Sequence, residues 1–116
     1  MSFANSVNIL GTTYNIAEVS DDKNKGLAGA TDFYTKTIEI ADMQGINSDA
    51  LITDDIESFR KAVLRHEIVH AFLYESGMDM QSGECESWAK NETVVDWFAL
   101  QGQKIYSAWQ EVGCIG

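Results

Sequence analysis

The chain has 116 residues, 45% of them hydrophobic and 22% charged, which suits one globular domain spanning residues 1–116. Eight basic residues against 18 acidic ones give a formal net charge of −10. A surface this acidic repels phosphates, so we expect the protein to bind neither nucleic acid nor anionic membranes. No apolar run could span a bilayer, and no basic, apolar leader opens the sequence. With two cysteines, too few for a disulfide scaffold, we expect a cytoplasmic protein.

The first third of the chain alternates apolar and polar residues, which predicts β-strands. The alternation runs over residues 7–9, changes phase across Gly11, and resumes over residues 14–16, so a turn or a bulge is expected at the glycine. A second pair of alternating segments, residues 28–33 and 37–41, flanks a short polar segment and predicts a hairpin. We expect these strands to form a small antiparallel sheet.

A helix is predicted after a connector over residues 42–53. Asp54 with Glu57 three residues later forms a capping box, and Thr53 is an alternative cap. The later turns of this helix are apolar nearly all round, which predicts burial, and Gly77 ends it.

A loop over residues 78–83 then leads to a second helical stretch. This stretch runs from about Glu84 to Val112, with Ser82 as its cap and Gly113 as its stop. A single straight helix of this length would be longer than so small a globule is wide, so a break or bend is expected near Gly102. Strands first and helices second indicate an α+β domain.

The two histidines of the chain, His66 and His70, lie four residues apart in the first helix. This spacing projects both rings from one face, where two imidazoles can bind one zinc ion. Glu67 borders that face and can meet a water molecule there without binding the metal. The string therefore matches the HExxH pattern of zinc hydrolases, and burial in an apolar helix would leave its polar groups in need of a metal. The alternative is an accidental match.

A catalytic zinc site needs a third protein ligand and an open position. Glu92 and Asp96 share one face of the second helix and are flanked by apolar residues, so we expect them on a buried stripe. The simplest arrangement has Glu92 bind the zinc while Asp96 accepts the outer N–H of a ligand imidazole. A solvated helix face is the alternative. The other downstream acids and cysteines remain candidates: Glu75, Asp79, Glu84, Cys85 and Glu86.

Residues 91–96 have the form NExxxD, and together with the upstream HExxH they resemble the gluzincin zinc peptidases. The length and the order of elements resemble minimal forms, the minigluzincins and the small ImmA/IrrE-type or phage-encoded metallopeptidases. The resemblance implies a zincin-like fold with an active-site helix and a glutamate helix. It implies His66, His70 and Glu92 as zinc ligands, Glu67 as general base, and Asp96 and Asn91 as their supports.

The expected activity is that of a zinc endopeptidase acting on a peptide or protein substrate, which could lie along an edge strand of the 28–41 hairpin. One alternative is a non-catalytic zinc domain closed by a fourth ligand, Cys85 or Cys114. Another is a phage or plasmid accessory binding module with a decayed site. We also expect that the C-terminal segment could make the enzyme latent, with the Cys114 thiolate on the zinc; a frayed tail with a free thiol is the alternative.

Overall fold

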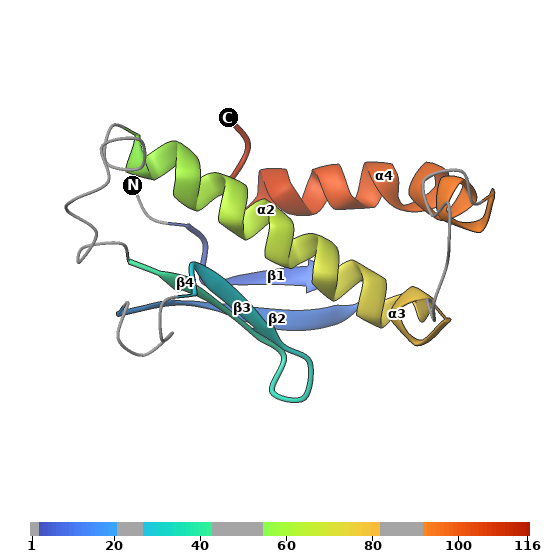
Figure 1. The fold of residues 1–116 in the computed structure, drawn as a ribbon, viewed down its shortest axis with the longest axis horizontal. Coiled ribbons are helices and arrows are strands. Elements are labelled where there is room, and N and C mark those ends of the chain that lie inside the picture. The colour runs from blue at the N-terminus through green and yellow to red at the C-terminus, as the bar shows by residue number, and fades with distance from the viewer. Residues whose placement is uncertain (1–2, 21–26, 43–54, 82–91) are drawn as a thin grey trace.

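The computed structural model describes residues 3–20, 27–42, 55–81 and 92–116. These residues form a four-stranded sheet followed by helices, which confirms the α+β class (Figure 1). The elements in chain order are β1 (Ser6–Ile9), β2 (Thr12–Val19), β3 (Gly29–Asp32), β4 (Thr37–Ala41), α2 (Ile56–Glu75), α3 (Met78–Gln81) and α4 (Glu92–Val112).

The sheet is mixed, so the expectation of an antiparallel sheet is wrong in one pairing. Its strand order is β1-β2-β4-β3. The β1–β2 and β3–β4 pairs are antiparallel, as the alternating segments predict, but β2 and β4 run parallel. The reason is that β3 lies at the outer edge, so the returning strand β4 fills the place beside β2. Alternation identifies a strand, but it does not give the position of that strand in a sheet.

Both hairpin turns use left-handed backbone. Leu10 and Gly11, with φ values of 53° and 93°, join β1 to β2 as a turn, which settles the choice between turn and bulge. The β3–β4 turn is held by Asp32, whose Oδ1 accepts from the backbone N–H groups of Tyr34 and Thr35. Lys36, with φ of 56°, completes this turn. The predicted hairpin over residues 28–41 is therefore confirmed.

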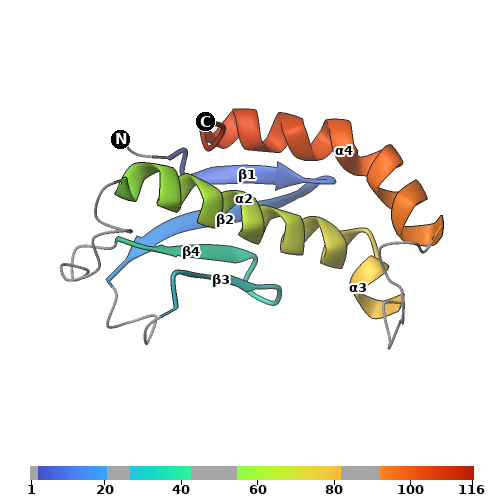
Figure 2. The same ribbon diagram turned by 45° about the horizontal axis from the view of Figure 1, so that its top comes forward.

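Helix α2 crosses one face of the sheet, and α4 lies beside α2 along β1 (Figure 2). The core lies between that face and the two helices. The strands contribute alternate residues to it, and α2 contributes one side of its length. Its fully buried large side chains are Val7, Ile9, Tyr14, Ile38, Ile40, Leu64, Ile68, Phe72, Ile105 and Cys114. Trp97 and Trp109 pack partly buried against it.

The ends of α2 agree with the predicted helix to within a residue. Its N-cap is Asp55, which accepts from the Ser58 N–H at 3.1 Å, so the predicted cap at Asp54 is wrong by one position. Gly77, with φ of 84°, follows the C-cap as predicted. The expected loop over residues 78–83 begins instead as the short helix α3.

Helix α4 ends at Val112, and Gly113 follows it with a φ of 83°, which confirms the predicted stop. Of the break or bend expected near Gly102, the break is absent, since α4 is one helix from Glu92 to Val112, but the helix does bend (Figure 2). Its first turns tilt away from the direction of its C-terminal half (Figure 2). The side chain of Trp97 donates to Ser76 Oγ at 2.8 Å and so joins α4 to the end of α2. The predicted connector over residues 42–53 lies outside the described residues except for Asp42, and so does the predicted cap at Ser82.

No helix in the described ranges is long and apolar enough to cross a membrane.

Candidate metal centre

The two histidines of the HExxH string face one another on the surface of α2. Their Nε2 atoms lie 3.1 Å apart, and their rings meet edge to face with centroids 4.7 Å apart. Both residues are exposed, so the expectation of a helix buried all round is wrong on this side. The core side of α2 is formed instead by residues such as Leu64, Ile68 and Phe72.

The separation of the two nitrogens fits a shared zinc ion. Two imidazole nitrogens at about 2.0–2.1 Å from one tetrahedral zinc are about 3.3 Å apart. The observed 3.1 Å is close to this value. Without metal, the same separation suits an N–H···N hydrogen bond between the rings of His66 and His70. The separation of these two nitrogens therefore suits a shared metal ion, and both His66 and His70 are exposed.

Glu67 lies in a more buried environment than its neighbour His66. One step along the helix turns its side chain by about 100°, from the exposed face toward the sheet. Glu67 is 8% exposed, and its Oε1 accepts a hydrogen bond from Thr31 Oγ1 at 2.7 Å. Thr31 is on β3, the edge strand of the sheet. The carboxylate thus lies at the border between the core and the exposed histidine face.

A shallow cleft opens beside this carboxylate. Its volume is about 320 Å³, and it lies between the start of β3 and the middle of α2. Its lining consists of small residues and of the first two residues of the HExxH string. The lining residues are Ala28, Gly29, Ala62, Val63, His66 and Glu67.

The proposed third ligand does not join the histidines in this structure. Glu92 and Asp96 are both exposed on the first turns of α4, so the expectation of a buried carboxylate stripe is wrong. Within the described ranges, no group of three or more His, Cys, Asp and Glu side chains is placed to hold a metal ion. Asp79, another candidate, is exposed on α3. The remaining candidates lie outside the described residues: Glu84, Cys85, Glu86 and the supporting Asn91.

Glu75, a candidate ligand that lies within the described residues, belongs to a separate cluster that the sequence did not reveal. Its carboxylate accepts from Tyr14 OH at 2.7 Å, Lys36 Nζ at 2.7 Å and Thr12 Oγ1 at 3.2 Å. Burial raises the pKa of Glu75, but these donors and the charge of Lys36 outweigh it and lower the pKa overall. Burial, together with the hydrogen bond to Glu75, raises the pKa of the Tyr14 phenol.

The same cluster anchors the end of α2 on both hairpins. Lys36 Nζ lies 5.0 Å from the centre of the Tyr74 ring, which stacks on Phe33 with centroids 4.3 Å apart. No sequence signal could have revealed it, because Tyr14 and Glu75 are 61 positions apart.

The C-terminal tail is fixed on the core side of α2 rather than at the histidines. Cys114 is fully buried, its Sγ lies 3.7 Å from the Trp109 carbonyl oxygen, and its own carbonyl accepts from Arg65 Nη1 at 2.7 Å. Burial raises the pKa of this thiol to about 11, so it stays protonated at neutral pH. The expectation of a Cys114 thiolate on the zinc is therefore wrong. Of the alternative, the free thiol is confirmed, but the tail is not frayed at Cys114.

Two arginines of α2 and a tyrosine of the β3–β4 hairpin lie in different surroundings from the HExxH side chains. Arg60 is buried among Glu18, Glu57 and the Phe3 ring, and Arg65 is bonded to the tail. Tyr34, at the tip of the β3–β4 hairpin, is 94% exposed.

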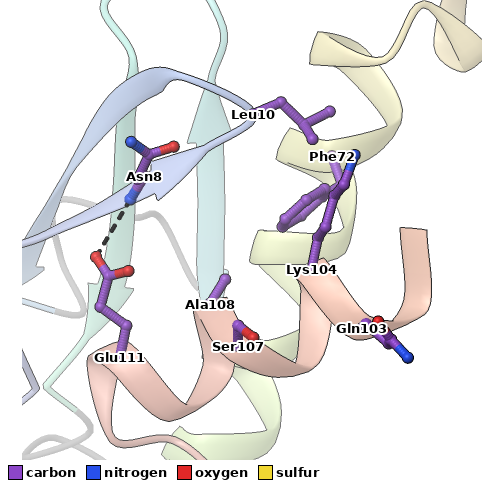
Figure 3. Close-up of a pocket in the computed structure, with 8 residues that line it drawn as sticks. All are labelled: Asn8, Leu10, Phe72, Gln103, Lys104, Ser107, Ala108 and Glu111. Carbon is purple, nitrogen blue, oxygen red and sulfur yellow. Dashed lines mark hydrogen bonds between the residues drawn. The ribbon is translucent and has the colours of Figure 1, made fainter. Parts of the chain in front are cut away.

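A larger groove of about 760 Å³ lies on the other side of the molecule, between β1 and α4 (Figure 3). Asn8 donates its N–H to Glu111 across the groove, and Phe72 lies at its base. None of the predicted site residues lines it. We therefore place the candidate site at the smaller cleft, which is lined by His66 and Glu67 of the HExxH string.

Comparison of this chain with protein-family models, with curated proteins and with solved structures gives no match.

Proposed function

We propose that this protein is a zinc-dependent endopeptidase with Glu67 as its general base. The observation that supports it best is the facing Nε2 pair of His66 and His70, 3.1 Å apart on an exposed surface beside the buried Glu67 side chain. A plain surface pair of histidines does not require a buried acid at its edge, whereas a hydrolase does.

His66 and His70 would hold the metal, and Glu92 is the proposed third ligand. Because α4 leaves Glu92 exposed and apart from the histidines, this assignment requires the first turns of α4 to approach α2 when metal binds. A bound zinc ion would polarise the scissile carbonyl and acidify a water molecule. Asp96, one turn further along α4, would move with Glu92 and reach a ligand ring.

Glu67 carries out the proton transfers. It accepts a proton from water as the water oxygen attacks the peptide carbonyl, and it passes that proton to the departing amine nitrogen. One C–O bond forms and one C–N bond breaks. Both hydrogens of the water are thereby accounted for, one on the new carboxyl group and one on the amine.

The edge strand β3 offers a place for an extended substrate. It pairs with β4 on one side only, and its first residue, Gly29, lines the cleft beside His66 and Glu67. A peptide added to this edge would run past the candidate site. The net charge of −10 favours encounter with basic peptides.

The alternative of a metal that only stabilises the fold needs a closed site with four protein ligands. The burial of Cys114 removes one of the two cysteines that could close it. The endopeptidase is therefore the function that the arrangement supports better.

Metal binding provides the first test. We expect about one equivalent of zinc per chain after titration and removal of excess metal, and a loss of at least tenfold in affinity for His66→Ala and His70→Ala. Protons compete for the imidazole nitrogens, so affinity should fall on acidification. A chain that takes up less than about a tenth of an equivalent would refute the zinc site.

A further inference from the structure

The edge strand β3 does more than border the cleft, because two of its side-chain positions face α2 at Glu67. Residues 29 and 31 lie on one face of the strand, and their partners across the β3–β4 ladder are Ile40 and Ile38, both fully buried. A Cβ added at Gly29 would lie 2.7 Å from Val63 Cγ1 and 3.2 Å from Glu67 Cγ. The glycine therefore lets the strand approach α2 closely enough for Thr31 to reach the carboxylate.

Thr31 makes two contacts with the same residue. Its Oγ1 lies 2.7 Å from Glu67 Oε1 and 3.4 Å from the Glu67 carbonyl oxygen. The hydroxyl is a neutral donor with a single proton, so it can hold one carboxylate oxygen without cancelling the charge. The second oxygen of Glu67 is left able to accept a proton from water.

We propose that Thr31 is a positioning residue, whose hydroxyl fixes the Glu67 carboxylate in the orientation that the general base needs. The inference rests on the proposed function for the role of Glu67, but the contact between the two residues stands independently of it. Thr31 thereby connects β3, the strand proposed to bind the substrate, to the Glu67 carboxylate, which transfers the proton.

Three variants of the full chain test this assignment. Thr31→Val keeps the shape of the side chain and removes the hydroxyl, whereas Thr31→Ser keeps the hydroxyl. Thr37→Val is the matched control, since Thr37 lies in the adjacent strand and its hydroxyl bonds to the Thr35 carbonyl. Each zinc-loaded chain is assayed on a set of internally quenched basic peptides, and zinc affinity is measured separately.

We expect Thr31→Val to lower kcat by about tenfold or more, with KM and zinc affinity unchanged within about twofold. Thr31→Ser should retain kcat within about threefold, and Thr37→Val should match the wild type. A role that depended only on the shape of the side chain would be kept in Thr31→Val and lost in Thr31→Ser. Unchanged kcat in Thr31→Val, or an equal loss in Thr31→Ser, would overturn the proposal.

A second measurement does not depend on activity. In the metal-free chain at pH 7, a double-mutant cycle of Thr31→Val and Glu67→Ala should give a coupling of about tenfold in the folding equilibrium constant. A coupling near onefold would overturn the contact itself. A wild-type chain that binds no zinc and cleaves none of the peptides would refute the proposed function and, with it, the catalytic role of Thr31. The cycle would still decide whether Thr31 holds Glu67.

Discussion

Glu67 and Glu75 are two carboxylates on the same helix, both directed toward the sheet, and their surroundings are opposite. Glu75 receives hydrogen bonds from Thr12, Tyr14 and Lys36, one of them a cation. Among the described residues, the carboxylate of Glu67 receives one bond, from the neutral hydroxyl of Thr31. Glu75 therefore has its charge compensated and its oxygens occupied, which suits a structural anchor. Glu67 retains acceptor capacity next to two exposed imidazoles, which suits proton transfer.

The largest contrast is expected in catalysis. Glu67→Gln should lower peptide hydrolysis by about 10²–10⁴-fold, because the amide cannot accept the proton from water. Zinc should stay bound, since Glu67 is not a proposed ligand. Glu75→Gln, the matched control on the same helix, should retain activity. Rates on the quenched peptides and metal content decide the result, and equal rates in Glu67→Gln and the wild type would contradict the assignment of the base.

Stability should show the reverse contrast. Glu75→Ala should lower the free energy of unfolding by about 2–3 kcal/mol, because it leaves the buried Tyr14 hydroxyl without its acceptor and Lys36 without its counter-charge. Urea denaturation measures this change. Glu67→Ala should cost less, since it removes a single bond from a neutral hydroxyl. A larger loss in Glu67→Ala would reverse the roles that we assign to the two carboxylates.

Acid should act on the Glu75 cluster. The pKa of Glu75 in the folded protein lies below its usual value of 4.5, so the unfolded chain binds the proton more readily. The resulting stability is present above about pH 4.5 and is lost as the pH falls through the lower folded-state value. In Glu75→Gln, the part of the unfolding free energy that the wild type loses through Glu75 on acidification should no longer depend on pH. Unfolding free energies between pH 3 and pH 7 would show the difference.

The smallest effects concern the glycine that lets β3 approach Glu67. Gly29→Ala should cost about 1–3 kcal/mol, because the added carbon meets Val63 at 2.7 Å. Gly102→Ala is the control, since the nearest atoms there are 3.7 Å away and alanine favours a helix. It should stabilise the protein by up to about 1 kcal/mol. Thermal or urea denaturation of both variants would distinguish a steric clash between β3 and α2 at position 29 from a general effect of alanine.

The sequence alone determined the features that depend on local spacing. Alternation located the strands and the 28–41 hairpin, and Gly77 and Gly113 marked the helix ends. The four-residue spacing of His66 and His70 placed both rings on one face, since helical periodicity is set within a single turn. These predictions needed no knowledge of which segments meet.

The tertiary structure decided everything that joins distant segments. The parallel β2–β4 pair follows from the position of β3 at the sheet edge, which alternation does not encode. Thr31 meets Glu67 across 36 positions, and Tyr14 meets Glu75 across 61. The apolar neighbours of Glu92 and Asp96 predicted that both carboxylates are buried, but both are exposed on the first turns of α4. Burial depends on which surface another element covers, and that is a property of the assembled fold.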